Sequence, residues 1–183
     1  MPQLIVFSGL PGTGKSSLAD AIGRELGIPV FAKDWLEATI RRCGLGESNL
    51  PTGLGFVSYE LLTTLAARQL GADQSVILDS VASTATIREQ WRTLAQTYHA
   101  QWRVIECICS DETIHRARLA NRQRGIPGWH ELDWSEVERV RGYFAPWDEE
   151  HLILDMISPL AVNTAAALSY IRAYSSNKKV GSA

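Results

Sequence analysis

Close to its start, the chain carries a glycine-rich run that ends in a lysine and a serine. The run consists of Gly9, Leu10, Pro11, Gly12, Thr13, Gly14, Lys15 and Ser16. It fits the pattern G-x-x-x-x-G-K-[ST]. Glycine lets the backbone curl so that several N–H groups point into one concavity, and the N-terminus of a following helix adds positive potential there. The spacing therefore predicts a loop that holds a polyphosphate.

The two side chains at the end of this loop have separate chemical roles. Lys15 supplies a mobile positive charge for β- and γ-phosphate oxygens, and the hydroxyl of Ser16 is placed to ligate Mg²⁺. The apolar residues 4–7 and the helical pattern that begins at Ser17 supply the strand–loop–helix context of the motif. A glycine-rich turn that arose by chance would not be expected to match this motif in its fixed residues, in its place in the chain and in the strand and helix on either side. We therefore predict that residues 9–17 bind the phosphates of a nucleotide.

Asp34 is the candidate for the residue that meets a phosphate acceptor. Gly27 and Pro29 give a stop signal for the first helix, and the apolar residues 29–32 predict a short second strand that delivers Asp34 to its end. In open α/β sheets, ligands bind beside the carboxyl ends of the strands. Aspartate is also a favoured N-cap, so Asp34 could instead cap the helix expected from about Trp35.

Asp79 is the candidate for a second contact to Mg²⁺. It stands near the end of the apolar segment 75–80, which predicts a third strand. An acidic group at a strand end beside a phosphate-binding loop can hold Mg²⁺ directly or through water. The alternative is that Asp79 caps the next helix, which Thr84 or Thr86 can also begin.

A basic segment further along the chain predicts a lid over the phosphates. We expect a helix over residues 114–124, stopped by Gly125, within a lid of about residues 116–134. Arg118 and Arg122 lie four residues apart and would share a face of this helix. A planar, permanently charged guanidinium suits contact with a transferring phosphoryl group, although a solvated basic face is the plainer alternative.

The remaining pattern alternates strands with helices. Expected strands cover 102–109 and 151–155, and expected helices cover 57–70, 84 or 86 to 99, 134–144 with a capping box at Ser135 and Glu138, and a last one from Ser158. This alternation predicts a three-layer α/β/α fold around a five-stranded parallel sheet. Residues 43–56 show no period and are expected to form a loop that lines the acceptor site.

Composition limits the class of protein. A chain of 183 residues fits one domain, which we place at residues 1–175 with a disordered tail at 176–183. A formal charge of −2 argues against a partner of duplex nucleic acid. Because no apolar run approaches the roughly 18 residues of a membrane span, we expect a cytoplasmic protein with no membrane partner. The three cysteines are an odd, scattered set, and Cys107 and Cys109 alternate in a strand-like run, which favours small buried hydrophobes over a disulfide or metal site.

With these motifs in place, the chain to about residue 174 resembles the P-loop small-molecule kinases. It looks closest to the subgroup with polynucleotide kinase 5′-kinase domains, chloramphenicol phosphotransferase, zeta-toxin-type kinases and AAA-family kinase-like ATPases. The resemblance implies that Asp34 receives the proton of the acceptor hydroxyl, that Asp79 lies near Mg²⁺, and that Arg118 and Arg122 form an R-L-x-x-R lid pattern. Polynucleotide kinases often carry arginine where this chain has Glu37, which argues against a 5′-hydroxyl nucleic acid substrate.

The resulting hypothesis is a kinase that uses ATP and Mg²⁺ to phosphorylate a hydroxyl of a small-molecule acceptor. Lys15, Asp34, Arg118 and Arg122 are its predicted catalytic residues. Three alternatives remain open: a nucleoside triphosphatase in which Asp34 orients water, a non-catalytic nucleotide-binding module, and a 5′-hydroxyl polynucleotide kinase. The sequence does not identify the acceptor and does not separate ATP from GTP.

Overall fold

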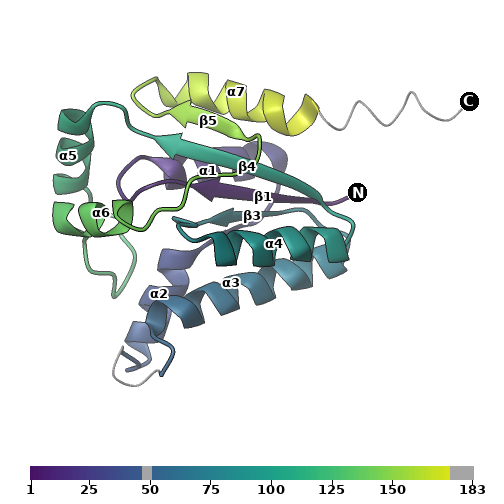
Figure 1. Ribbon diagram of the computed structural model, residues 1–183, viewed down its shortest axis with the longest axis horizontal. Coiled ribbons are helices and arrows are strands. Elements are labelled where there is room, and N and C mark those ends of the chain that lie inside the picture. Colours follow the sequence, from purple (N-terminus) through teal and green to yellow (C-terminus); the bar gives the residue numbers. More distant parts are fainter. Residues whose placement is uncertain (47–50, 174–183) are drawn as a thin grey trace, which may run out of the picture.

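A five-stranded sheet in which all neighbouring strands run parallel forms the centre of the computed structural model, which describes residues 1–46 and 51–173 (Figure 1). The order across the sheet is β2-β3-β1-β4-β5. The strands are β1 (Gln3–Ser8), β2 (Val30–Ala32), β3 (Val76–Asp79), β4 (Gln101–Ile108) and β5 (Leu152–Asp155). The predicted α/β fold with a five-stranded parallel sheet is confirmed.

Helices cover both faces of this sheet. They are α1 (Lys15–Leu26), α2 (Lys33–Arg42), α3 (Leu54–Gly71), α4 (Ala85–Thr97), α5 (Glu112–Ala120), α6 (Trp134–Arg141) and α7 (Leu160–Ala173). α1 and α7 cover one face, whereas α3 and α4 cover the other (Figure 1). α5 and α6 lie together beyond the carboxyl ends of the central strands (Figure 1). None of the helices in the described ranges is long and apolar enough to cross a membrane.

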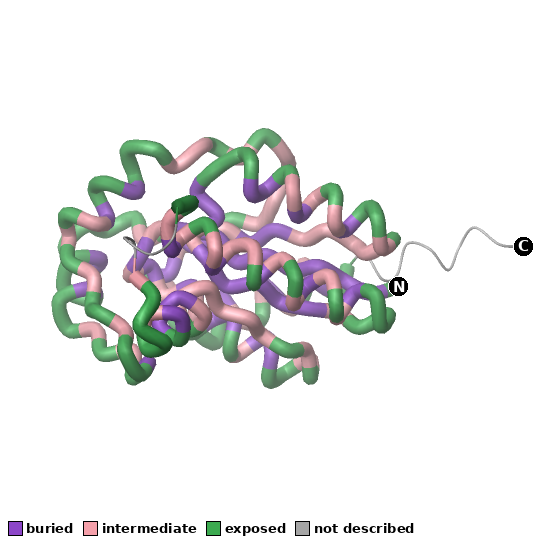
Figure 2. Tube along the Cα trace, turned by 90° about the horizontal axis from the view of Figure 1, so that it is seen from below, coloured by how far each residue is buried: buried purple, intermediate pink, exposed green. Residues whose placement is uncertain are grey.

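The central strand β1 divides the core in two. All six of its residues are buried, and the tube in Figure 2 shows the buried strands enclosed by more exposed helices. Ile5 and Phe7 pack into the core beneath α1 and α7, whereas Leu4 and Val6 pack into the core beneath α3 and α4. Trp91 is fully buried in the second core. Because β1 is fixed on both faces, the loop that follows it starts from a rigid position.

The helix predicted over 114–124 is too long. α5 ends at Ala120, and the residues from Asn121 to Asp133, which we call the arginine loop, are not helical. The side chain of Asn121 donates from Nδ2 to the carbonyl of Ala117 at 2.9 Å, which satisfies a carbonyl at the helix end. Arg122 therefore lies beyond the helix and does not share a helical face with Arg118.

Further differences concern the ends of helices in the described residues. The predicted capping box at Ser135 is wrong, because Asp133 is the N-cap of α6 and accepts from the N–H of Glu136 at 3.2 Å. Glu138 instead accepts from the indole of Trp134 at 2.8 Å. α3 begins at Leu54, inside the segment expected to be a loop, after Gly53 with φ of 80°. Residues 47–50 of that segment and the expected tail at 176–183 lie outside the described residues.

Candidate active site

The phosphate-binding loop joins the buried end of β1 to the start of α1. Gly9 has φ of 136°, and a Cβ there would stand 2.2 Å from the carbonyl oxygen of Cys107, so only glycine fits. Gly14, with φ of 105°, is the N-cap of α1 and offers no side chain to the first-turn N–H groups. The first turn of α1 also contains no acidic residue. This helix N-terminus is therefore available to an anion.

Lys15 is the buried cation of this loop. The residue is only 5% exposed, and burial lowers the pKa of its ammonium to about 8. The carboxylate of Asp79 acts in the opposite direction, while the charges of Arg122 and Arg124 lower the pKa further. An ammonium in this state gains from any anion that enters the loop.

Asp79 and Ser16 fit a divalent cation. Asp79 is 4% exposed, and its Oδ1 is buried without a hydrogen-bond partner among the described residues. Burial raises the pKa of Asp79, and Lys15 and the Ser16 hydroxyl partly offset that rise. The described residues contain no group of three acidic, histidine or cysteine side chains that could hold a metal. An Mg²⁺ ion at Ser16 and Asp79 would therefore need water and phosphate oxygens as its other ligands, which is its usual preference.

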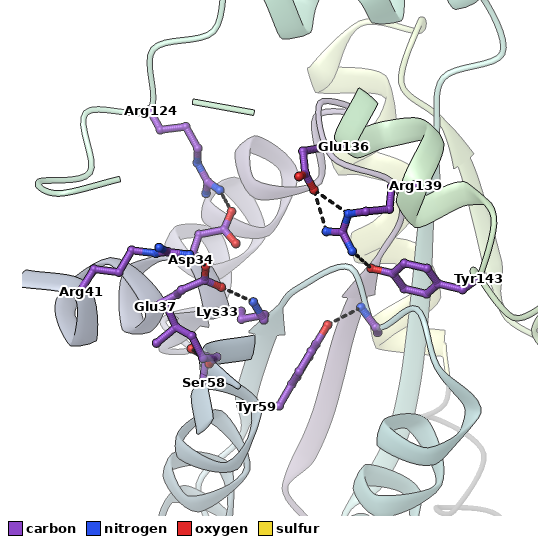
Figure 3. Close-up of polar contacts among 12 residues, drawn as sticks. Lys33, Asp34, Glu37, Arg41, Ser58, Tyr59, Arg124, Glu136, Arg139 and Tyr143 are labelled. Atoms are coloured by element: carbon purple, nitrogen blue, oxygen red, sulfur yellow. Dashed lines mark hydrogen bonds and ion pairs between the residues drawn. The ribbon is translucent and has the colours of Figure 1, made fainter. Parts of the chain in front are cut away.

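Arg124 joins the carboxylate of Asp34 to the hydroxyl of Ser16 in the phosphate-binding loop. Its Nη1 forms an ion pair with Asp34 Oδ2, and its Nη2 donates to Ser16 Oγ at 3.1 Å. The arginine side chain is 8% exposed and that of Asp34 is 23% exposed. One guanidinium thus connects the first turn of α2 to the phosphate-binding loop. Figure 3 shows its pair with Asp34.

Two cavities adjoin this ion pair. The first has a volume of about 630 Å³ and contains, among its lining residues, Gly12, Gly14, Lys15, Ser16, Ser17, Arg118, Arg122 and Arg124. The second has a volume of about 410 Å³ and contains Pro11 and Asp34. We call them the loop cavity and the Asp34 cavity. Their arrangement gives room for a nucleotide on the Arg124 side of the pair and for a second molecule on the Asp34 side.

The structure distributes the predicted site residues among three cavities, except for Asp79, which lines none of the three. Lys15, Ser16, Arg118 and Arg122 line the loop cavity together, whereas Asp34 lines the neighbouring one. Gly9, Leu10 and Thr13 line neither cavity; they face a third cavity of about 350 Å³ beside Cys107. Arg118 is exposed, while Arg122 is half-buried and close enough to Lys15 and Asp79 to affect their pKa values.

Neither aspartate is a helix cap. The N-cap of α2 is Ala32, and Asp34 lies within the first turn of that helix. The N-cap of α4 is Thr84, five positions beyond Asp79. Asp79 pairs in register with Phe7 of β1 and with Ala32 of β2, directly beside the phosphate-binding loop. The two capping alternatives are thereby removed, and the roles of both carboxylates in a site stay predictions.

Comparison with known families agrees with this geometry. The family model described as an AAA domain matches residues 4–146, which is more than half of the chain. The chain belongs to the AAA domain family. This AAA domain is 33% identical over 116 residues to the uncharacterized protein Rv2004c of Mycobacterium tuberculosis. The alignment covers 59% of this chain and 23% of that relative, so the chain spans about a quarter of the relative's length.

Solved structures of kinases share the fold of this AAA domain. A gluconokinase from Sinorhizobium meliloti 1021 has a TM-score of 0.71 at 19% identity, with 100% of this chain and 98% of that chain covered. The APS kinase CysC of Mycobacterium tuberculosis in complex with AMPPNP and APS has a TM-score of 0.60 at 18% identity, with 93% and 98% covered. Because the sequence identities are below 20%, the similarity to these structures establishes the fold, which is that of the P-loop kinases.

Sequence reasoning misses three parts of the site in this AAA domain. The basic character of Arg124 is plain, but no local pattern indicates that it reaches Asp34, 90 residues away. Glu37 accepts from Lys33 at 2.5 Å and from Arg41 at 3.0 Å, which the spacing of four residues could have suggested. Tyr59 lines the Asp34 cavity from α3, a placement that the sequence around it does not indicate.

The buried ammonium predicts how nucleotide binding by this AAA domain depends on pH. A bound phosphate favours the charged form of Lys15. At a pH above the pKa of Lys15, the free protein carries a neutral amine there, so nucleotide binding must be accompanied by uptake of a proton. Affinity should be level below the pKa of about 8 and should fall as the pH rises above it. Above that pKa, the affinity for ATP should fall by up to about tenfold per pH unit. Calorimetry with ATP measures this fall.

The control for this pH dependence is Lys15→Arg, because a guanidinium stays charged throughout the range. Its affinity for ATP should show no fall between about pH 8 and pH 9. An unchanged affinity of the parent protein across that interval would contradict the assignment of the charge to Lys15.

Proposed function

We propose that this protein is an ATP-dependent kinase that transfers the γ-phosphoryl group to a hydroxyl of a small molecule. The observation that carries the proposal is the contact of Arg124 with both Asp34 and Ser16, since it joins the phosphate-binding loop to a carboxylate that lines a separate cavity. A kinase needs two adjoining binding volumes with a carboxylate on the acceptor side.

The chain's own residues supply the binding and positioning in this proposal. The N–H groups at the start of α1 and the ammonium of Lys15 bind the phosphates, with Met156 and Leu160 as apolar lining further along the loop cavity. Ser16 and Asp79 would hold Mg²⁺, which neutralises charge on the phosphate oxygens when bound. Asp34 orients the acceptor hydroxyl and accepts its proton as the oxygen attacks phosphorus.

Arg124 must change partners during such a reaction. Its guanidinium pairs with the proposed proton acceptor and donates to the proposed metal ligand, so both groups are engaged by this one side chain. We propose that the triphosphate draws Arg124 away from Asp34, after which the arginine meets the phosphoryl group alongside Arg122. Contact of Arg118 and Arg122 with the transferring phosphoryl group stays a prediction. We propose Arg124 as a third arginine in that role.

Arg124→Ala should therefore have a smaller effect than loss of the carboxylate. The variant loses one donor to the phosphoryl group, but it also frees Asp34 and Ser16. We expect kcat to fall about tenfold, below the usual cost of a lost electrostatic donor. Steady-state kinetics measure this, and Arg116→Ala, which removes an exposed arginine of α5, is the control. A variant without any measurable activity would contradict the partner exchange.

The test of the function is release of ADP with and without acceptors. A panel of alcohols, including sugars, nucleosides, aminoglycosides, chloramphenicol and 5′-hydroxyl oligonucleotides, should contain a compound that accelerates ADP release and becomes phosphorylated. ADP release that depends on no compound would support a nucleoside triphosphatase. ATP binding without turnover would support a nucleotide-binding module, and phosphorylation of oligonucleotides alone would support a polynucleotide kinase.

A further inference from the structure

The chemistry of the Asp34 cavity points to a class of acceptor. α2 supplies Lys33, Asp34, Glu37 and Arg41, and α6 with the residues after it supplies Glu136, Arg139 and Tyr143, so two charged groups face each other across the cavity (Figure 3). Its volume of about 410 Å³ lies at the lower end of the range for small-molecule sites. A monosaccharide or a compound of similar size would fit.

The α2 group has its charges engaged with one another. Glu37 is buried and accepts from Lys33 Nζ at 2.5 Å and from Arg41 Nη2 at 3.0 Å. Burial would raise the pKa of Glu37, but the two cations outweigh it and hold that pKa below its usual value. An anionic ligand would have to draw one of these cations away from a buried, ionised carboxylate, which is costly.

The α6 group is also paired, but at a more exposed position, where the Arg139 side chain is 62% exposed and that of Glu136 is 37% exposed. Glu136 accepts two hydrogen bonds from Arg139 through one oxygen, at 2.6 Å and 3.1 Å, and Arg139 Nη1 also lies 3.5 Å from the hydroxyl of Tyr143. Among the described residues that line the cavity, each lysine or arginine is thus paired with a carboxylate. Three basic side chains, Lys33, Arg41 and Arg139, balance three acidic ones, Asp34, Glu37 and Glu136.

Most of the remaining lining is aromatic and apolar, with Ser83 and His130 as further polar side chains. Tyr59, Trp129 and Tyr143 contribute rings, and Val81, Leu132 and Val140 contribute aliphatic surface. Aromatic faces pack against the C–H face of a ring while paired charges and hydroxyls at their edges exchange hydrogen bonds with its substituents. Among the lysines and arginines of this lining, a phosphate or carboxylate would meet only cations that the described residues already pair, and the imidazole of His130 is the other basic side chain there. A hydroxyl can both donate to and accept from groups that stay paired.

We infer that the acceptor is an uncharged polyhydroxylated ring compound, such as a neutral sugar, a cyclitol or a nucleoside, and that the cavity discriminates against its phosphorylated or carboxylated counterparts. This inference rests on the proposed function and narrows it. Glu37 and Glu136 are its specificity-determining residues, because each holds a cation that an anionic acceptor would need.

Matched pairs of acceptors test the inference. Hexoses and pentoses are assayed beside aldonic acids and sugar phosphates, inositol beside inositol phosphate, and nucleosides beside nucleoside monophosphates, with ADP release and product formation as readouts. We expect the neutral member of the productive pair to have kcat/KM at least tenfold higher, a preference of about 1.4 kcal/mol. A preferred anionic member would overturn the inference and leave the kinase intact. ADP release that ignores the whole panel would overturn the proposed function.

Releasing a cation should change this preference. Glu136→Gln frees Arg139 on the exposed side of the cavity without altering the size of the side chain. Its ratio of kcat/KM for the anionic over the neutral member should rise about tenfold, with the affinity for ATP unchanged. Glu112→Gln, which breaks a similar exposed pair with Arg116 on α5, should leave the ratio as in the parent. An equal ratio in both variants would overturn the role of Glu136.

Discussion

Asp34→Asn is expected to lower kcat for phosphoryl transfer by about 100-fold to 10,000-fold, the range for loss of a general base. The amide keeps the size of the side chain but does not accept a proton from the acceptor hydroxyl. Asp34 lies in the Asp34 cavity, outside the lining of the loop cavity. The affinity for ATP should therefore change little, and the loss should appear in kcat rather than in nucleotide binding.

Because Asp34 forms an ion pair with Arg124, the experiment on Asp34→Asn needs a control for loss of structure. The amide in Asp34→Asn would weaken that pair, so thermal unfolding should be measured together with steady-state rates, and Glu25→Gln provides the same change in charge at an exposed position of α1. A purely structural role predicts a lower unfolding temperature and reduced ATP binding. A catalytic role predicts normal ATP binding with a slow chemical step, while retention of the parental kcat would remove Asp34 from the mechanism.

The phosphate-binding loop and the two aspartates could be predicted because local sequence determines them. The loop requires glycine at fixed positions, and Asp34 and Asp79 follow apolar strands whose carboxyl ends meet at one edge of a parallel sheet. Because β2, β3 and β1 are adjacent in the sheet, Asp34 and Asp79 lie near the phosphate-binding loop. No side-chain contact had to be known to place them beside the loop.

The arginine loop could not be predicted because long-range contacts decide its course. The apparent helical run of residues 114–124 is interrupted at one residue, Asn121, and the residues that follow are held by pairs to distant elements. Arg124 contacts α2 and the start of α1, and its backbone N–H donates to Glu131 at 2.9 Å. Helical periodicity contains no information about such partners.

Glu37, which stands where polynucleotide kinases often carry arginine, can be interpreted further from the structure. By resemblance, its acidic character counts only against a nucleic acid end as substrate. The structure shows a buried carboxylate that pairs with Lys33 and Arg41 at four-residue spacing on α2. In the proposed acceptor site, the same residue would bear on substrate choice because it neutralises two cations. That role depends on burial, which the order of residue types does not show.

Lys15→Met is expected to lower kcat/KM by about 100-fold to 1,000-fold, equivalent to about 3–4 kcal/mol of lost transition-state stabilisation. Methionine keeps an apolar stem in the buried position, and it removes the only ammonium that the described residues place in the loop cavity. ATP affinity should fall as well, because the charge interacts with bound phosphates before the reaction. Single-turnover rates and calorimetry separate these two losses.

The partner of Lys15 gives this prediction a second readout. Asp79 is buried, and Lys15 is the main charge that offsets the effect of burial on its pKa. Removing the ammonium should raise the pKa of Asp79 further, so that the carboxyl is more often protonated and competes less well for Mg²⁺. The Mg²⁺ concentration for half-maximal activity should therefore rise in Lys15→Met and stay at the parental value in Arg24→Met, an exposed change on α1. Parental rates and an unchanged Mg²⁺ requirement in Lys15→Met would contradict the assignment of the loop as a triphosphate site.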